Sequence, residues 1–225
     1  GGNTSENALG CPPDVVPMGT TVTDCANFTG IGTISQAVTT ANITSELITF
    51  TCNGTIVFTE SLFISGDVTI IGGGDIIFDS GGARGLFRVG YSEREFPLPN
   101  EVIPLSSLLL DGVTLQNGAS MGAIFNEEYG TVTVSNSTFS NNLGWYDAAV
   151  FNLGTLIISN STFRENRGGA IFNAGTATII TSTFINNGAT AIGGMITNSG
   201  TATVITSTFI NNGIERDSDS AITNN

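Results

Sequence analysis

The C-terminal half of the chain repeats one pattern of apolar and polar positions. Each copy begins with Gly-Thr, alternates apolar and polar residues over a short run, and continues through a polar turn into a Ser-Thr-Phe run. Alternation of this kind is the pattern of a half-buried β-strand. The copies start at Gly130, Gly154, Gly175 and Gly200, at spacings of 24, 21 and 25 residues. A short apolar phrase, such as AIFN at 170–173, closes each copy, so the pattern predicts three short strands per unit.

Three short strands in a unit of this length are typical of one turn of a parallel β-helix, whose strands pair with their counterparts in the next turn. Stacked turns convert sequence columns into ladders, in which rings stack at a strand spacing of about 4.8 Å and Asn amides hydrogen-bond along the row. An antiparallel sandwich explains neither the constant order of the runs nor the match between 176–188 and 201–213. We therefore predict an all-β parallel β-solenoid with a buried Phe ladder, which Leu115 continues in a diverged earlier copy, and with an Asn ladder at one bend. The ladder positions are Phe139, Phe163, Phe184 and Phe209, and Asn142, Asn166, Asn187 and Asn212.

Unit length varies at one place only, between the ladder Asn and the closing phrase. Insertions at this place would all bulge from one edge of the solenoid, and the variable edge of a repeat protein is often its binding edge. The first insertion, 143–148, contains Trp145 and Tyr146. These two aromatic residues are candidates for contact with a sugar or a neighbouring protein, and folding back over the flank of the solenoid is the alternative.

The N-terminal part is less regular. Short apolar runs such as VTIIGGG continue through it, so we assign 47–225 to the β-helix. Upstream, one apolar stripe recurs at helical spacing: Ile34, Ala37, Val38 and Ala41. Residues 25–46 are therefore predicted to hold a short capping helix that shields the strand edges of the first turn. Residues 1–24 form an N-terminal extension with a strand-like segment available for exchange between molecules.

Composition and charge narrow the range of functions. The chain contains no Lys and no His, and six Arg against 19 acidic residues give a net charge of −13. A field of this sign repels phosphate backbones and excludes nucleic-acid binding. No apolar run approaches the length of a membrane span, and no signal-peptide pattern opens the chain.

The chain resembles a known group of proteins. The succession of ISQAVTTAN, ITFTCNGTI, VTIIGGG, FRVG and the repeated STF and AIFN phrases is similar to right-handed parallel β-helix proteins of the pectate-lyase-like superfold. It is more closely similar to exported bacterial and archaeal repeat proteins that resemble polymorphic outer-membrane proteins. The resemblance covers 25–225 and implies a right-handed β-helix, an extracellular or cell-surface location, and a disulfide between Cys25 and Cys52 with Cys11 unpaired or in an intermolecular bond. From the residues alone, pairing of Cys11 with Cys25 stays open, because three cysteines allow one bridge.

Enzymes of this superfold use a basic residue beside carboxylates, or several Asp on adjacent turns. Here Lys and His are absent, and ion pairs between neighbouring turns are the simpler explanation for Arg164 and Arg167 near Glu165. We therefore expect no enzyme activity, no catalytic residue and no cofactor. One loop supplies clustered oxygens that suit Ca²⁺, with a solvated loop as the alternative. The candidate ligands are Glu215, Asp217 and Asp219.

Six segments match the Asn-x-Ser/Thr acceptor pattern for N-glycosylation. Several matches are expected by chance in a chain so rich in Asn, Ser and Thr. The candidate sites are Asn3, Asn27, Asn42, Asn53, Asn136 and Asn160.

These observations favour an extracellular structural protein whose partner is a second copy of itself. The sequence stops at AITNN, within a closing phrase, so we expect the last turn to offer its strand edges to the N-terminal extension of a neighbour. Such a head-to-tail contact builds a filament or a surface layer. The alternatives are a carbohydrate-binding or carbohydrate-active β-helix, with glycans as partners, and a passenger fragment of a surface adhesin.

Overall fold

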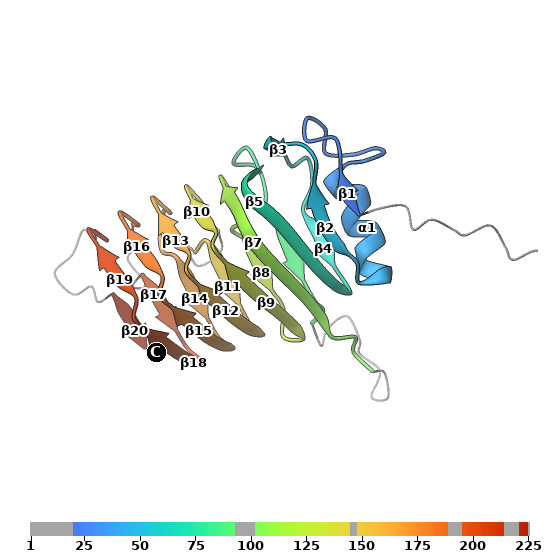
Figure 1. The fold of residues 1–225 in the computed structure, drawn as a ribbon. Helices are drawn as coiled ribbons and strands as arrows, with labels where there is room; N and C mark the ends of the chain where they lie inside the picture. The colour runs from blue at the N-terminus through green and yellow to red at the C-terminus, as the bar shows by residue number, and fades with distance from the viewer. Residues whose placement is uncertain (1–19, 93–101, 145–147, 189–194, 214–220, 225) are drawn as a thin grey trace, which may run out of the picture.

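The computed structural model describes residues 20–92, 102–144, 148–188, 195–213 and 221–224. The chain winds into a parallel β-solenoid of about seven turns, with one short helix at its N-terminal end (Figure 1). Alternating apolar residues point inward along nearly every strand and form one continuous core. The predicted all-β parallel β-solenoid with an N-terminal helix is confirmed.

The elements are short, as the repeat predicts. In chain order they are β1 (Thr21–Val22), α1 (Ile34–Thr44), β2 (Leu47–Phe50), β3 (Gly54–Val57), β4 (Leu62–Ile64), β5 (Asp67–Asp79), β6 (Phe87–Val89), β7 (Ser106–Gln116), β8 (Ile124–Asn126), β9 (Gly130–Ser135), β10 (Thr138–Ser140), β11 (Val150–Asn152), β12 (Thr155–Ser159), β13 (Thr162–Arg164), β14 (Ile171–Asn173), β15 (Thr176–Ile180), β16 (Thr183–Ile185), β17 (Ile196–Asn198), β18 (Thr201–Ile205), β19 (Thr208–Ile210) and β20 (Ile222–Asn224).

The strands form two sheets, and the pairings within them are parallel. The smaller sheet has seven strands, one per turn, in the order β20, β17, β14, β11, β8, β6, β4. The larger sheet contains β18, β15, β12 and β9, passes through β7, and returns along β10, β13, β16 and β19. A regular turn such as β9, β10 and β11 therefore visits the larger sheet twice and the smaller sheet once.

The larger sheet bends along a column of residues in the left-handed conformation. Gly and Asn adopt this conformation with the least conformational strain, and Thr adopts it with more. The bend separates β9 from β10, whereas β7 passes through it as one long strand. Its members, with φ between 48° and 64°, are Gly112, Asn136, Asn160, Thr181 and Thr206.

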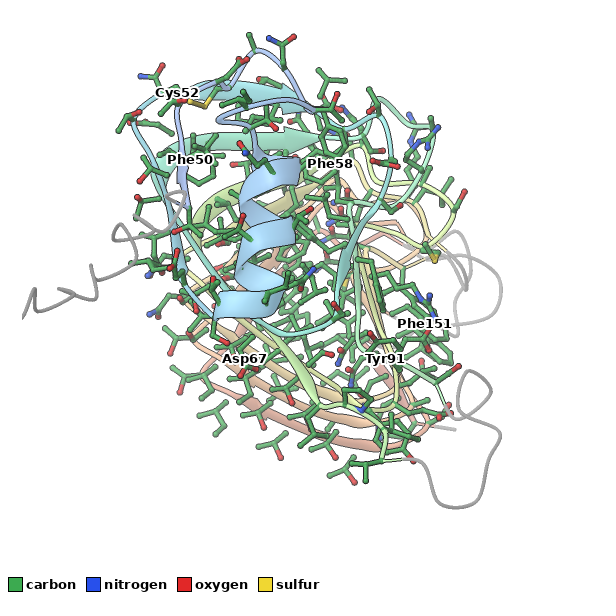
Figure 2. The ribbon with its side chains drawn as sticks, turned by 90° about the vertical axis from the view of Figure 1, so that its right-hand side faces the viewer. Phe50, Cys52, Phe58, Asp67, Tyr91 and Phe151 are labelled. Carbon is green, nitrogen blue, oxygen red and sulfur yellow. A yellow bond between two sulfur atoms is a disulfide. The ribbon has the colours of Figure 1, made fainter. Side chains whose placement is uncertain are left out.

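Helix α1 lies over the first turn and covers that end of the solenoid (Figure 2). The apolar stripe predicted from helical spacing is its buried face: Ile34, Ala37, Val38 and Ala41. The helix ends where Ser45 takes a left-handed conformation and its N–H donates to the carbonyl of Ala41. The helix prediction within 25–46 is therefore confirmed.

The first turn uses residues that the sequence assigned to the N-terminal extension. Strand β1 pairs in parallel with β2, placing Thr21 opposite Thr49. Just after β1, Cys25 forms a disulfide with Cys52, with their Cα atoms 5.8 Å apart. Residues 20–24 thus belong to the solenoid, and the remainder of the extension, 1–19, lies outside the described residues.

The Phe ladder runs along the inside of β10, β13, β16 and β19. Neighbouring rings are nearly parallel, and their centroids lie 4.4, 4.9 and 4.9 Å apart from Phe139 to Phe209. Leu115 occupies the same column in β7, opposite Phe139. Each stacked pair contributes about 1 kcal/mol beyond the burial of its surface.

The Gly-Thr start of each unit has a packing reason. A Cβ atom on Gly154 would press into the carbonyl oxygen of Gly130 in the preceding turn. The same close approach recurs from Gly175 to Gly154 and from Gly200 to Gly175. Only glycine lets these turns stack at strand spacing at this corner.

Candidate functional site

The predicted Asn ladder ties successive turns together. The Nδ2 of Asn166 donates to the carbonyl of Phe139 at 3.1 Å and to Oδ1 of Asn187 at 2.8 Å. Its Oδ1 accepts from the backbone N and from Nδ2 of Asn142, both at 3.0 Å. The side chain is fully buried, and Asn187 bonds to Asn212 in the same way. Each of these amides therefore links its own turn to the turns on both sides.

A second Asn ladder, which the sequence analysis missed, runs through the last residue of each closing phrase. It consists of Asn126, Asn152, Asn173, Asn198 and Asn224. Each Nδ2 donates to Oδ1 of the next member, at 2.7, 2.6, 2.7 and 3.1 Å. The Oδ1 of Asn126 has no partner among the described residues, because Val89 takes this column in the turn before. The recurring Asn of the AIFN phrase was the available signal.

A Ser ladder, also missed, holds the bend of the larger sheet. Its members are Ser137, Ser161, Ser182 and Ser207. The N–H of each of the first three donates to Oγ of the next, at 3.2 to 3.3 Å, and each Oγ donates to the carbonyl two residues earlier in its own turn. The ladder satisfies backbone groups that the left-handed residue removes from the strand pairing.

A further stack of like residues lies on the side of the smaller sheet that faces away from the core. Phe125, Phe151 and Phe172 alternate with the inward side chains of their strands, and their ring centroids are 5.1 and 4.8 Å apart. In the preceding turn, Arg88 takes the same column and pairs with Glu127 at 2.9 Å. Phe125 and Phe151 are only 7% and 6% exposed, so these two rings are packed against neighbouring atoms, whereas Phe172 is half-buried.

A groove of about 480 Å³ opens on the variable edge, where the insertions begin. It is lined by Gly81, Gly82, Asn117, Gly118, Ala119, Asn141, Leu143 and Arg167. Its walls offer backbone groups, two Asn amides and one guanidinium, and this set suits hydroxyl or carboxylate groups of a ligand.

One carboxylate is fixed beside the groove. Asp79 accepts hydrogen bonds from the N–H of Gly81 at 2.7 Å, from Nδ2 of Asn117 at 2.9 Å and from Nε2 of Gln116 at 2.8 Å. Partial burial raises the pKa of this carboxyl, but the hydrogen bonds from Asn117, Gly81 and Gln116 together outweigh it and lower the pKa below its ordinary value. Asp79 is therefore an ionised acceptor that shapes the turn at Gly81.

Among the carboxylates that the structure describes, none is shared by Arg164 and Arg167. Arg164 pairs with its neighbour Glu165 at 3.1 Å, and both side chains are about half exposed. The ion pair lies within one turn, whereas the sequence predicted pairs between turns. The residues opposite Arg164 in the two neighbouring turns are Ser140 and Ile185, which carry no charge. Arg167 lines the groove instead.

The candidate glycosylation sites differ in their surroundings. Exposed acceptors are Asn27, Asn53, Asn136 and Asn160. Asn42 is committed to the fold, because its Nδ2 donates to the carbonyl of Phe63 and its Oδ1 accepts from the N–H of Ser65, both at 2.9 Å. Asn3 lies outside the described residues.

Several other predicted positions also lie outside the described residues: Cys11, Trp145, Tyr146, Glu215, Asp217 and Asp219. Within the described part of the chain, no three His, Cys, Asp or Glu side chains gather closely enough to hold a metal ion. The same part contains no helix long and apolar enough to cross a membrane.

Comparison of the chain with protein-family models, with curated proteins and with solved structures finds no match. Of the resemblance noted in the sequence, the parallel β-solenoid is confirmed, and export stays a prediction.

Proposed function

We propose that the protein is an extracellular structural β-solenoid that associates end to end with copies of itself. The ladders carry this proposal. Phe, Asn and Ser columns run through successive turns, and their polar and aromatic groups are used in contacts between those turns. Identical residues at the same place in every turn favour packing between turns over recognition of a ligand at one of them.

Each turn is a template for the next. Thr176 pairs with Thr201, Phe184 with Phe209 and Ile179 with Val204. Within the described residues, β18 pairs with β15 and β19 pairs with β16. An extended segment of a neighbouring copy, added on the side away from β15 and β16, would continue this parallel pairing. Because α1 covers the opposite end, contact between the two ends joins unlike surfaces, and such contacts propagate into filaments.

The segment that we propose to supply this contact is 1–19 of a neighbouring copy. Residues 20–24 are not available for exchange, since β1 pairs with β2 and the disulfide at Cys25 anchors the chain that follows. Deletion of 1–19 is expected to abolish assembly in sedimentation velocity while leaving the solenoid folded. A variant with 1–19 scrambled at constant composition is the matched control and is expected to assemble poorly. Full-length protein that stays monomeric at high concentration, or unimpaired assembly of the deletion variant, would contradict the proposal.

The disulfide and the acidic charge support the extracellular location. A bridge such as Cys25–Cys52 persists in oxidising compartments, and a net charge of −13 keeps a surface protein soluble. Thiol labelling of native material before and after reduction tests this point. Cys25 and Cys52 are expected to label only after reduction, and labelling before reduction would place the protein in a reducing compartment.

A second candidate function, carbohydrate binding, is favoured by the groove on the variable edge. A hydroxyl-rich ligand would find the amides of Asn117 and Asn141 there, beside the guanidinium of Arg167. A panel of polysaccharides with and without Ca²⁺ tests this function. Specific retention that is lost in Trp145→Ala and in Arg167→Ala would favour it, and no retention or turnover on any member would remove it.

A further inference from the structure

One outer surface of the solenoid is a regular array of threonines. The strands β9, β12, β15 and β18 lie side by side with closely similar directions (Figure 1). Their side chains that face away from the core are each exposed or half-buried. We call these twelve residues the Thr face. In three rows across the strands they are Thr131, Thr155, Thr176 and Thr201; Thr133, Ile157, Thr178 and Thr203; and Ser135, Ser159, Ile180 and Ile205.

The Thr face has two fixed repeats. Neighbouring strands are about 4.8 Å apart, and alternate residues along a strand are about 6.6 Å apart. Thr131 lies directly opposite Thr155, and Thr178 directly opposite Thr203, so the rows are in register. The Ser ladder and the second Asn ladder bond to the backbone of these strands: Oγ of Ser161 donates to the carbonyl of Ser159, and Nδ2 of Asn126 donates to the carbonyl of Thr155. The result is a rigid two-dimensional lattice of hydroxyl and methyl groups.

The chemistry of the Thr face excludes most ligands. It contains no charged side chain and no aromatic side chain, although the chain as a whole has a net charge of −13. Ions would find no counter-charge there, and sugar rings would find no stacking surface. A protein partner would find none of the Trp, Tyr or Arg anchors that dominate interfaces. Seven Thr, two Ser and three Ile make up the Thr face, and the ligand that matches their uncharged hydroxyl and methyl groups is water itself.

Water can be ordered by such a lattice. Each Thr hydroxyl donates and accepts hydrogen bonds, and the methyl groups between them restrict the orientation of first-shell water. The repeat across the strands is close to an oxygen–oxygen repeat in hexagonal ice. We propose that the Thr face binds ice. It would hold a layer of water molecules in positions that match the surface of an ice crystal. The face ends at β7, where Leu109 and Asp111 replace Thr and Ser.

The full chain with its disulfide intact is the material for the test. Thermal hysteresis and inhibition of ice recrystallisation are measured for wild type, Thr178→Lys and Thr183→Lys. Thr178 lies in the middle of the Thr face, and Thr183 lies in the next strand on the other side of the bend. Both are half-buried strand threonines, so the second variant is a matched control. Wild type and Thr183→Lys are expected to inhibit recrystallisation, and Thr178→Lys is expected to lose most of this activity.

Circular dichroism verifies that each variant is folded, and Thr203→Lys, at an exposed position of the Thr face, replaces Thr178→Lys if that variant does not fold. The proposal is overturned if wild type neither shapes ice nor inhibits its recrystallisation. It is also overturned if Thr183→Lys loses as much activity as Thr178→Lys. Two further outcomes would assign the Thr face to another partner: concentration-dependent dimers that Thr178→Lys separates, or retention on crystalline cellulose that Thr178→Lys removes.

Discussion

Replacing Asn166 by alanine tests how strongly an Asn ladder holds adjacent turns. The side chain makes four hydrogen bonds, with Phe139, Asn187 and Asn142, and it is fully buried. At about 1 kcal/mol per hydrogen bond, their loss costs about 4 kcal/mol of the free energy of unfolding. The backbone N–H of Asn142 also loses its acceptor and stays buried. Because a buried donor without an acceptor is costly, the loss of free energy of unfolding is expected at the upper end of the range for single substitutions.

Denaturant unfolding of Asn166→Ala measures this cost, with the slope of the transition reporting whether the turns still unfold together. Asn53→Ala is the control, because Asn53 is exposed and the change there is expected to stay within about 0.5 kcal/mol. A loss below about 1 kcal/mol for Asn166→Ala, with Asn53→Ala unchanged, would refute the view that the amides carry the contact between turns.

Asn166→Asp separates hydrogen bonding from packing, since the two side chains have nearly the same size. The new oxygen would face the carbonyl of Phe139 and Oδ1 of Asn187, both acceptors. Burial beside acceptors raises the pKa of the new carboxyl in the folded state. Its contribution to stability is then fully present below the unfolded pKa of about 3.9 and is lost as the pH rises through the folded pKa. Unfolding midpoints that do not fall between acidic and neutral pH would contradict this reasoning.

Three further predictions concern other parts of the solenoid. Reduction of Cys25–Cys52, which closes a loop with a sequence separation of 27, is expected to lower the free energy of unfolding by about 3 kcal/mol; an unchanged melting temperature in reductant would contradict it. Thr181 has a left-handed backbone with φ of 49°, so Thr181→Asn is expected to raise the free energy of unfolding by about 1 kcal/mol in denaturant unfolding. A decrease would contradict the view that this backbone conformation costs stability. Asp79→Asn is expected to be less stable than wild type above about pH 4, and the difference in free energy of unfolding should shrink as the pH falls through the lowered folded pKa of Asp79. A difference that grows in acid would contradict this prediction.

The sequence was most informative where turns repeat. Phe163 and Phe184 stand at the same place in two copies, and parallel in-register pairing carries that column directly into space. Asn173 and Ser161 stand at equally constant places, but a polar residue beside turn residues resembles a solvent-exposed bend. Their burial depends on partners one turn away, and a single unit of sequence does not contain those partners. The second Asn ladder and the Ser ladder therefore escaped prediction.

The first turns were harder to predict for a different reason. Strand β1 has two residues, too few for an alternating pattern, and its pairing with β2 depends on the return of the chain after α1. The groove combines Gly82, Ala119 and Arg167 from different turns, none of which belongs to a repeated column. Such positions become neighbours through stacking alone, and only the structure brings them together.

Electron microscopy of the native material tests the central claim, that this solenoid is a structural unit joined end to end. Filaments or layers in which solenoids lie end to end are expected, with a repeat of about 4.8 Å along their axis from the stacked strands. Dispersed single particles, each the size of one chain at high protein concentration, would contradict it.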